Sequence, residues 1–399
     1  MSPERAYLRT SLRLLAAGLA LFAWFNLSAD AFGIYRRFHL PHWHTEPEVW
    51  SRVSSAERIA DDCHAVFMGS SRIVHGFGPH IPRWGNRNVC NGALAGTSIQ
   101  EQRLVFDWVL RQPTIRNAVI FLDFHMFHSL RGTHGDFAQS RFNPDRTRLT
   151  YHAWALTSLD ATKASFRAIG RPLPWLDEVR PPIPQTRANR IELYRFFRNP
   201  KLYGGWQGDD ETMSILTTML DDADRRNIRV MVVIPPVHAI LLETEAMMGT
   251  WDAVKDWKRE LVRRCHDRET PVQVWDFSTY SPPAVSPMPL QAADPLNPWW
   301  TDVSHQSMHL GFMTMSRVTE AALEDGGSWD EDFGVRLTPD NLEAHLARID
   351  EGRERWRNTQ PAQLAWLEAY AEQLRRMDAP ALGDDDHALA PGAFNPTLP

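Results

Sequence analysis

The stretch His64-Ala-Val-Phe-Met-Gly-Ser-Ser-Arg72 decides how this chain folds. Its first part is an uninterrupted apolar run, which is typical of a strand covered on both faces of a sheet. The run ends in a glycine followed by two adjacent serines, which predicts a tight turn into a helix. A buried strand that leads through a turn into a helix is the repeating unit of a parallel α/β sheet.

The same alternation of short apolar runs and longer helical stretches continues downstream. Further strands are predicted over 88–91, 117–123, 228–234 and 272–277, and helices over 98–111, 210–226 and 243–267. Ser98 and Glu101 have the spacing of a capping box at a helix start. The chain therefore predicts an α/β fold in three layers (α/β/α), with a mostly parallel sheet between helices.

Changes in composition divide the chain into five segments. The segment 125–208 breaks the strand–helix alternation and is rich in Arg, Pro and aromatic residues, so we expect an insertion with short helices over one sheet edge. We predict a membrane anchor or signal segment at 1–33, a juxtamembrane linker at 34–61, the α/β domain with its insertion at 62–325, a helical extension at 326–378 and a disordered tail at 379–399.

The amino terminus predicts a membrane segment. Arg5, Arg9 and Arg13 precede the leucine- and alanine-rich stretch 14–27, the pattern of a secretion signal or of a single membrane anchor. Ala29-Asp-Ala31 resembles a cleavage site, so both an uncleaved anchor and a cleaved signal remain open. In either case we expect the rest of the chain outside the cytoplasm, in the periplasm or an equivalent compartment, or secreted after cleavage.

Composition excludes some partners and constrains the cysteines. Among 399 residues, 43% are hydrophobic and 23% charged, and the net charge is −6 with no long basic run, which argues against nucleic-acid binding. Cys63 opens the first predicted strand and Cys90 closes the second, so parallel strands would hold them at opposite ends of the sheet. With Cys265 as the third, we expect free, mostly buried thiols.

Three segments carry the candidate chemistry. Ser71 follows the first predicted strand, where ligands bind in open α/β sheets and where its amide and the next helix favour a developing oxyanion. The loop 91–96 is built from small residues and offers further amides. Asp302 and His305 are three residues apart before a predicted helix at 310–323. At a turn, Asp302 can orient His305, and His305 can take the proton of Ser71.

These blocks resemble the SGNH or GDSL-like hydrolase superfamily. Gly69-Ser70-Ser71 is similar to its first block, with Ser71 at the nucleophile position, and 91–96 is similar to its second block, Asn-x-Gly-x-x-Gly. Asp302-Val-Ser-His305 resembles the last block, which completes the triad. The resemblance implies oxyanion or substrate contacts from Ser71, from Ala93 and Gly96 in the second block, and from Asp123 at the third strand end.

The sequence departs from this family at two positions. Ala93 stands where the second block has a glycine, and Leu122-Asp123-Phe124-His125 stands where the third block, Gly-x-Asn-Asp, supplies an oxyanion asparagine. Removal of one oxyanion donor can cost a few kcal/mol of transition-state stabilisation. We therefore expect a substitute donor or a weaker or redirected activity.

The resemblance and the amino terminus together predict a function. Membrane-anchored relatives that transfer acyl groups on envelope polymers, as in alginate acetylation and teichoic acid D-alanylation, have similar blocks behind a membrane segment. We expect a serine esterase or O-acyltransferase acting on acyl, above all acetyl, esters of an envelope or exported polysaccharide. No cofactor or metal is expected. The alternative is a non-catalytic protein that binds polysaccharide or partner proteins in an export complex.

Each candidate residue also has a purely structural interpretation. Ser71 could cap the following helix, and Asp302 could be a helix cap beside an incidental surface His305. Asp123 with His125 could be a hydrogen-bonded core pair, and Arg72 could form a salt bridge rather than bind substrate. The histidines at 39, 42 and 44 could belong to a juxtamembrane belt rather than to a metal site.

Overall fold

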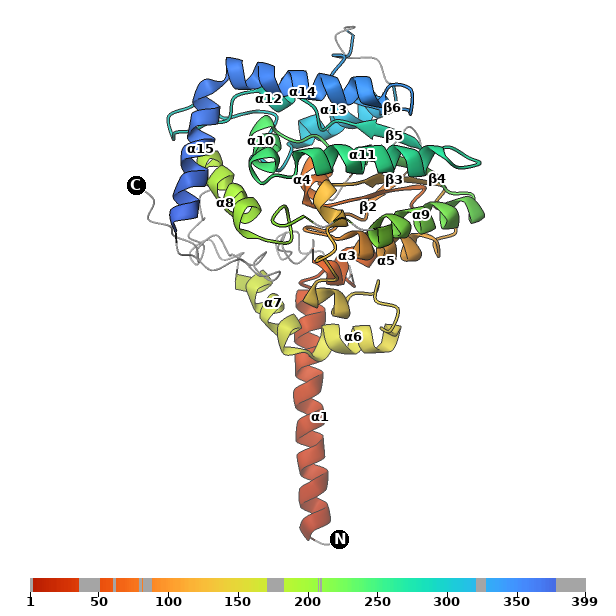
Figure 1. Ribbon diagram of the computed structural model, residues 1–399. Helices are drawn as coiled ribbons and strands as arrows, with labels where there is room; N and C mark the ends of the chain where they lie inside the picture. Colours follow the sequence, from red (N-terminus) through yellow and green to blue (C-terminus); the bar gives the residue numbers. More distant parts are fainter. Residues whose placement is uncertain are drawn as a thin grey trace. The chain divides into compact units, whose positions relative to one another are not determined.

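The structure is a computed structural model that describes residues 3–35, 51–59, 62–78, 81, 88–170, 183–206, 208, 210–320 and 328–377. The chain forms two compact units. The first, the N-terminal unit, comprises Met1–Arg58 and Gly135–Pro181, and the second, the sheet unit, comprises Ile59–His134 and Pro182–Pro399. Figure 1 shows the elements of both. The predicted histidine cluster at 39–44 and the predicted tail at 379–399 lie outside the described residues.

The sheet unit is built on a six-stranded sheet. Its strands are β1 (Ala65–Met68), β2 (Val89–Asn91), β3 (Asn117–Phe121), β4 (Arg229–Ile234), β5 (Gln273–Asp276) and β6 (Val335–Leu337), in the order β2-β1-β3-β4-β5-β6. The first five run parallel and β6 pairs antiparallel with β5. This confirms the predicted α/β class with a mostly parallel sheet. β6 was not predicted, since it comes from the segment expected to be entirely helical.

Helices cover both faces of this sheet. α4 (Ser71–Phe77) connects β1 to β2, which lies on one side of β1 in the sheet. The connections that contain α5 (Ile99–Val109), α9 (Asp210–Arg225) and α11 (Trp251–His266) each lead to a strand further along the sheet in the other direction. Right-handed crossovers therefore place α4 on one face and α5, α9 and α11 on the other. The remaining helices of this unit are η1 (Phe124–Phe127), α8 (Gln185–Arg198), α10 (Ala239–Met247), α12 (Pro282–Val285), α13 (Met308–Val318), α14 (Leu342–Thr359) and α15 (Pro361–Arg376).

Two helix predictions differ in outcome. The predicted N-cap is confirmed, because Ser98 Oγ accepts the amide of Glu101 at 3.2 Å at the start of α5. The other half of the predicted capping box is not shown, since the Glu101 carboxylate accepts the amide of His134 at 2.8 Å. The single helix predicted over 243–267 is wrong. Gly249 has a positive φ of 78°, which stops α10 and lets the chain restart as α11.

The turn after β1 requires a glycine. Gly69 has φ of +155°, and a Cβ there would lie 2.7 Å from Ile73 and 2.9 Å from Phe121. The rings of Phe67 on β1, Phe77 on α4 and Phe121 on β3 pack with centroids 5.1 to 5.8 Å apart. This core fixes the direction in which α4 leaves the sheet, and with it the position of Ser71.

A glycine contact holds α4 against α13. A Cβ on Gly311 would lie 2.0 Å from the carbonyl oxygen of Gly76, and a Cβ on Gly76 would meet the Gln306 side chain at 2.3 Å. The two helices therefore approach as closely as their backbones allow. Since α4 begins at Ser71 and α13 follows His305 by three residues, this contact sets the separation of those two side chains.

We predict that Gly311→Ala separates α4 from α13. The added methyl group overlaps backbone atoms that cannot rotate away, and overpacking of this kind costs about 1–3 kcal/mol of unfolding free energy. Thermal unfolding of the full chain in detergent measures the loss. Gly132→Ala is the matched control, because a Cβ there has no neighbour within 4 Å. Equal melting temperatures for the two variants would contradict this account of the contact.

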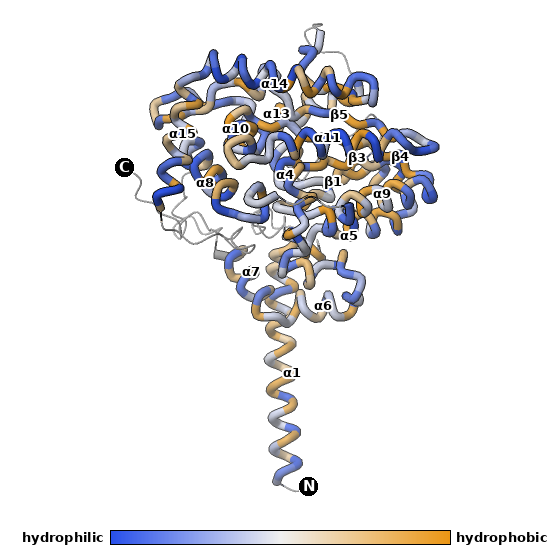
Figure 2. The backbone as a smooth tube through the Cα atoms, viewed as in Figure 1, coloured by the Kyte–Doolittle hydropathy of each residue, from blue (hydrophilic) through white to orange (hydrophobic). Residues whose placement is uncertain are grey.

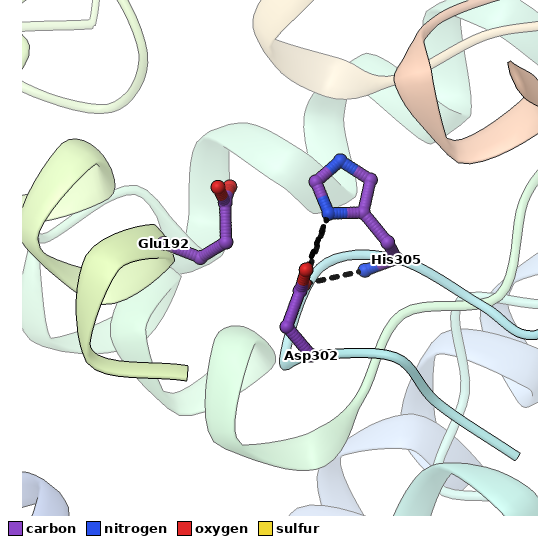
Figure 3. A group of neighbouring side chains, drawn as sticks. All are labelled: Glu192, Asp302 and His305. Carbon is purple, nitrogen blue, oxygen red and sulfur yellow. Dashed lines mark hydrogen bonds and ion pairs between the residues drawn. The ribbon is translucent and has the colours of Figure 1, made fainter. Parts of the chain in front are cut away.

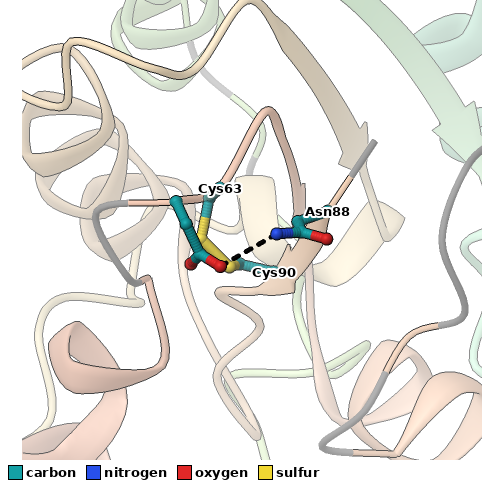
Figure 4. Close-up of a disulfide and its surroundings, with 4 residues drawn as sticks. Cys63, Asn88 and Cys90 are labelled. Carbon is teal, nitrogen blue, oxygen red and sulfur yellow. Dashed lines mark hydrogen bonds between the residues drawn. A yellow bond between two sulfur atoms is a disulfide. The ribbon is translucent and has the colours of Figure 1, made fainter. Parts of the chain in front are cut away.

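Cys63 and Cys90 form a disulfide, so the prediction of free thiols at these positions is wrong (Figure 4). Their Cα atoms are 5.8 Å apart, within bridging range. The amides of His64 and Ala65 both donate to the carbonyl of Asn88, so the chain bends across β2 just before β1 begins. In addition, β2 has only three residues, and Cys90 is its middle one. Cys265 is free and buried, as expected.

Thiol counting tests the bridge. The denatured, non-reduced chain should react with one equivalent of a thiol reagent, from Cys265, and the reduced chain with three. A loop closed over a sequence separation of 27 should stabilise the fold by about 3–4 kcal/mol in the chain-entropy model, so Cys63→Ser should lower the melting temperature. Three reactive thiols without reductant would show that the bridge does not form.

The described residues of the N-terminal unit are mostly helical. They form α1 (Pro3–Ala29), α3 (Arg52–Arg58), η2 (Gly135–Gln139), α6 (Arg148–Thr157) and α7 (Leu159–Gly170). α1 is long and apolar enough to cross a membrane (Figure 2). Only 11% of its most apolar window is buried. The segment predicted as one insertion, 125–208, is thus divided between the units: residues 135–181 belong with α1, and α8 belongs with the sheet.

Candidate active site

Ser71 lies at the point where the chain reverses its direction across the sheet. β1 is followed by β2 on one side, and β3 lies on its other side, so the carboxyl ends of β1 and β3 flank a topological switch point. The cap of α4 is Ser70, whose Oγ accepts the amide of Arg72 at 3.2 Å. Ser71 is the first residue of the helix, where its amide has no partner within the helix. The capping role therefore belongs to Ser70, and the Ser71 hydroxyl is left for other contacts.

A short hairpin presents Asp302 and His305. Trp300 and Gln306 form an isolated antiparallel bridge, and the amide of Thr301 donates to the carbonyl of His305 at 2.9 Å. Asp302 Oδ1 accepts the amides of Ser304 at 2.8 Å and of His305 at 2.9 Å. Asp302 and His305 are therefore held together by a turn that the Asp302 side chain closes within the hairpin. The cap of α13 is Ser307 rather than Asp302.

The structure brings the three predicted residues together. His305 Nδ1 lies 2.8 Å from Asp302 Oδ2, and His305 Nε2 lies 2.8 Å from Ser71 Oγ, across 234 residues of sequence. Asp302 and His305 are 8% and 7% exposed, and Ser71 is half-buried. This is the arrangement of nucleophile, base and orienting carboxylate that acyl-transfer triads use.

Burial and charge shift the pKa values of Asp302 and His305 in opposite directions. Burial would raise the pKa of Asp302, but the adjacent His305 and hydrogen bonds to it lower the pKa below its usual value. Burial would lower the pKa of His305, but Asp302 outweighs it and raises the pKa above 6.5. The histidine is therefore a stronger base than a free imidazole.

A buried ion pair between Arg72 and Asp123 lies next to Ser71. Arg72 Nη1 contacts Asp123 Oδ1, and Arg72 Nε donates to the carbonyl of Ser304 at 3.1 Å. One guanidinium thus joins the start of α4, the end of β3 and the hairpin. The expectation that Asp123 contacts substrate needs correction, because its carboxylate is 2% exposed and neutralises Arg72. The predicted salt bridge of Arg72 is confirmed.

The loop 91–96 does not supply the expected amide at Ala93. The amide of Ala93 donates to Oδ1 of Asn91 at 3.0 Å, and the amide of Leu94 donates to the carbonyl of Gly69 at 2.9 Å. Gly96 has a positive φ of 61°, and its carbonyl accepts Arg131. Ala93 is therefore committed within the loop in this structure, because an N–H that closes such a turn cannot also point at an oxyanion. The prediction for Gly96 is left untested.

Sequence reasoning missed two residues beside His305. Glu192 of α8 is buried, and its carboxylate lies within 4.8 Å of the ligand atoms of Asp302 and His305 (Figure 3). The His75 ring, one turn along α4 from Ser71, has its centroid 4.4 Å from that of His305. The i,i+4 spacing of Ser71 and His75 could have indicated the second. No sequence signal indicated Glu192, because its helix lies in the irregular insertion.

Glu192, Asp302 and His305 are also the one group in the described part of the chain that could hold a metal ion. Their donor set of two carboxylates and an imidazole suits zinc. Both nitrogens of His305 are already hydrogen-bonded, to Asp302 and to Ser71. A metal ion at this group would have to displace the triad contacts, so the geometry fits proton transfer better than coordination.

An apolar pocket adjoins the hairpin. It measures about 220 Å³ and is lined by Pro282, Pro283, Trp299, Met313, Trp329, Asp330 and Phe333. Trp299 stands at the base of the hairpin, where its carbonyl accepts the amide of Ser307.

Comparison with known proteins adds no relative. No protein-family model matches the chain, and no curated protein matches it significantly. The interpretation of the site therefore depends on its geometry.

We predict that Glu192→Gln shifts the pH dependence of any reaction that uses His305 as a base. Asp302 and Glu192 both raise the pKa of His305, and Arg72 lowers it, so removal of the Glu192 charge should lower that pKa. Because the base acts only when neutral, kcat/KM should fall as pH drops through the His305 pKa. This acid limb should lie above pH 6.5 in the wild type and move to lower pH in the variant.

A pH–rate profile with an ester substrate makes the measurement. Glu211→Gln, an exposed change on α9, serves as the control, because α9 lies on the face of the sheet opposite α4. An unchanged acid limb in Glu192→Gln would show that this carboxylate does not act on His305.

Proposed function

We propose that this chain is a membrane-anchored serine esterase or O-acyltransferase of the SGNH type, acting outside the cytoplasm. The observation that carries the proposal is the pair of 2.8 Å contacts of His305, one to Ser71 Oγ and one to Asp302 Oδ2. The order of the blocks along the chain and the strand order β2-β1-β3-β4-β5 support it.

The geometry supports a two-step acyl transfer. Ser71 Oγ attacks the carbonyl carbon of an ester while His305 Nε2 takes the hydroxyl proton, and Asp302 stabilises the resulting imidazolium. The proton then passes to the departing alcohol oxygen, leaving an acyl group on Ser71. Water or a sugar hydroxyl next gives its proton to His305 and attacks the acyl carbon, which releases an acid or a new ester.

The oxyanion donors are the weak part of this site. The amide of Ser71 is available at the first position of α4, but the amide of Ala93 donates to Asn91, and the segment 122–125, which resembles the third block, contains no asparagine. Loss of one such donor costs about 10²–10³ in kcat in other serine enzymes. We therefore expect a slow enzyme on simple esters.

Two features support an extracytoplasmic location. α1 is long and apolar enough to span a membrane, and its first part carries Arg5, Arg9 and Arg13 before the apolar stretch 14–27. The Cys63–Cys90 disulfide is a bond that persists in oxidising compartments. The substrate class, an acylated envelope or exported polysaccharide, is inferred from the resemblance to membrane-anchored family members.

Ester hydrolysis tests the proposal. The full chain in detergent should release nitrophenol from p-nitrophenyl acetate, and Ser71→Ala should reduce the rate by at least about 10³-fold, because the nucleophile is lost. Ser70→Ala should lose only its cap, about 1 kcal/mol of stability, and keep its rate within about tenfold. Full activity in Ser71→Ala, or none in the wild type, would contradict the proposal.

The oxyanion geometry also favours a second candidate, a non-catalytic protein that binds polysaccharide or partners in an export complex. It would bind its ligand at the same residues without bond cleavage. This candidate predicts that the wild-type chain is retained on an acylated glycan column and hydrolyses no ester. Ester turnover that depends on Ser71 would exclude it.

A further inference from the structure

The end of α1 is part of a folded unit and not a free stalk. Asn26, 3% exposed, donates through Nδ2 to the carbonyl of Leu156 at 2.9 Å and to Thr162 Oγ1 at 3.0 Å. α6 and α7 thus pack around the last turns of α1 (Figure 1). We call α6 and α7 with residues 26–35 the collar.

The suspected cleavage site lies inside the collar. Ala29 and Ala31 are 1% and 2% exposed, and Ala31 packs against Ala164 and Ala168. Asp30 has a positive φ of 41°, and its carboxylate accepts the amide of Ile34 at 2.8 Å. Cleavage after Ala31 would remove the central element of this unit, so the fold favours retention of α1.

The outer surface of the collar carries three large exposed apolar side chains. Leu149 on α6 and Leu159 and Phe166 on α7 are 79%, 70% and 65% exposed. Leu159 and Phe166 are seven residues apart and lie on one helical face. The Phe166 ring has its centroid 4.7 Å from that of Phe25 on α1. The apolar surface of α7 is therefore continuous with the apolar surface of the membrane helix.

Basic side chains accompany these apolar ones. Arg148, Lys163 and Arg167 are exposed on the same two helices. Asp160 is the single acidic residue on them. Short helices with large exposed apolar residues and basic neighbours are typical of segments that lie in a membrane interface.

We propose that the collar lies in the interface of the bilayer that α1 crosses, with Leu149, Leu159 and Phe166 among the acyl chains. Arg148, Lys163 and Arg167 contact anionic headgroups. This inference depends on the proposed anchoring of α1 and is independent of the chemistry at Ser71. It gives the N-terminal unit two attachments to the membrane, a spanning helix and an interfacial surface, and thereby restricts the tilt of α1.

Depth-dependent quenching tests the collar. The full chain is reconstituted in phosphatidylethanolamine–phosphatidylglycerol nanodiscs with one environment-sensitive fluorophore on Leu19→Cys, Leu159→Cys, Phe166→Cys or Thr218→Cys. Thr218 is exposed on α9 and is the control. Cys265 is buried, which raises its pKa to about 12, and the unsubstituted chain measures background labelling.

The positions report separately on anchoring and on the collar. Lipids with a quencher near the headgroup should quench the labels at 159 and 166 at least about twofold more than the label at 218. Lipids with a deep quencher should quench the label at 19. If the label at 19 is quenched but the labels at 159 and 166 are quenched no more than the label at 218, the collar inference is wrong and the anchoring of α1 stands. This holds whether water or a partner protein covers the collar surface. No quenching at 19 would overturn anchoring and the collar together.

Discussion

The hydrogen bond between His305 Nε2 and Ser71 Oγ joins residues that are 234 positions apart, and much of the sheet unit serves to hold its two ends in place. A hydrogen bond tolerates a few tenths of an ångström in length. Three contacts restrict it to that range: the glycine turn at Gly69, the backbone contact of Gly76 with Gly311, and the Arg72 guanidinium. Each joins elements distant in sequence, so the site depends on the whole sheet unit.

The Arg72–Asp123 ion pair also limits what the site can be. Two charges with 4% and 2% exposure are stable only as a pair, since an unpaired buried charge costs several kcal/mol. Asp123 lies in the segment 122–125, which resembles the third block of the SGNH family but contains no asparagine. In the proposed site, Asp123 therefore holds Arg72 in place, and this strand end offers no asparagine side chain to an oxyanion.

The elements predicted best were those with strong local signals. The apolar runs before Gly69 and over 117–123 have no polar face and gave the strands, and Ser98 with Glu101 gave the helix start. Ser71, Asp302 and His305 were found because strand-end position and spacing are local properties. Glu192 was missed because it reaches the site by tertiary packing of an irregular segment. The disulfide was missed because the chain bends at His64 and Ala65, whose amides both donate to the carbonyl of Asn88, and residue spacing does not encode such a bend.

The proposed chemistry requires Ser71 to be an activated nucleophile and not a turn residue. Incubation of the full chain with a fluorophosphonate, followed by intact mass and peptide mapping, measures this. We expect one covalent adduct, on Ser71, that disappears in His305→Ala because the hydroxyl loses its base. An unmodified chain, or an adduct elsewhere with Ser71 free, would contradict it.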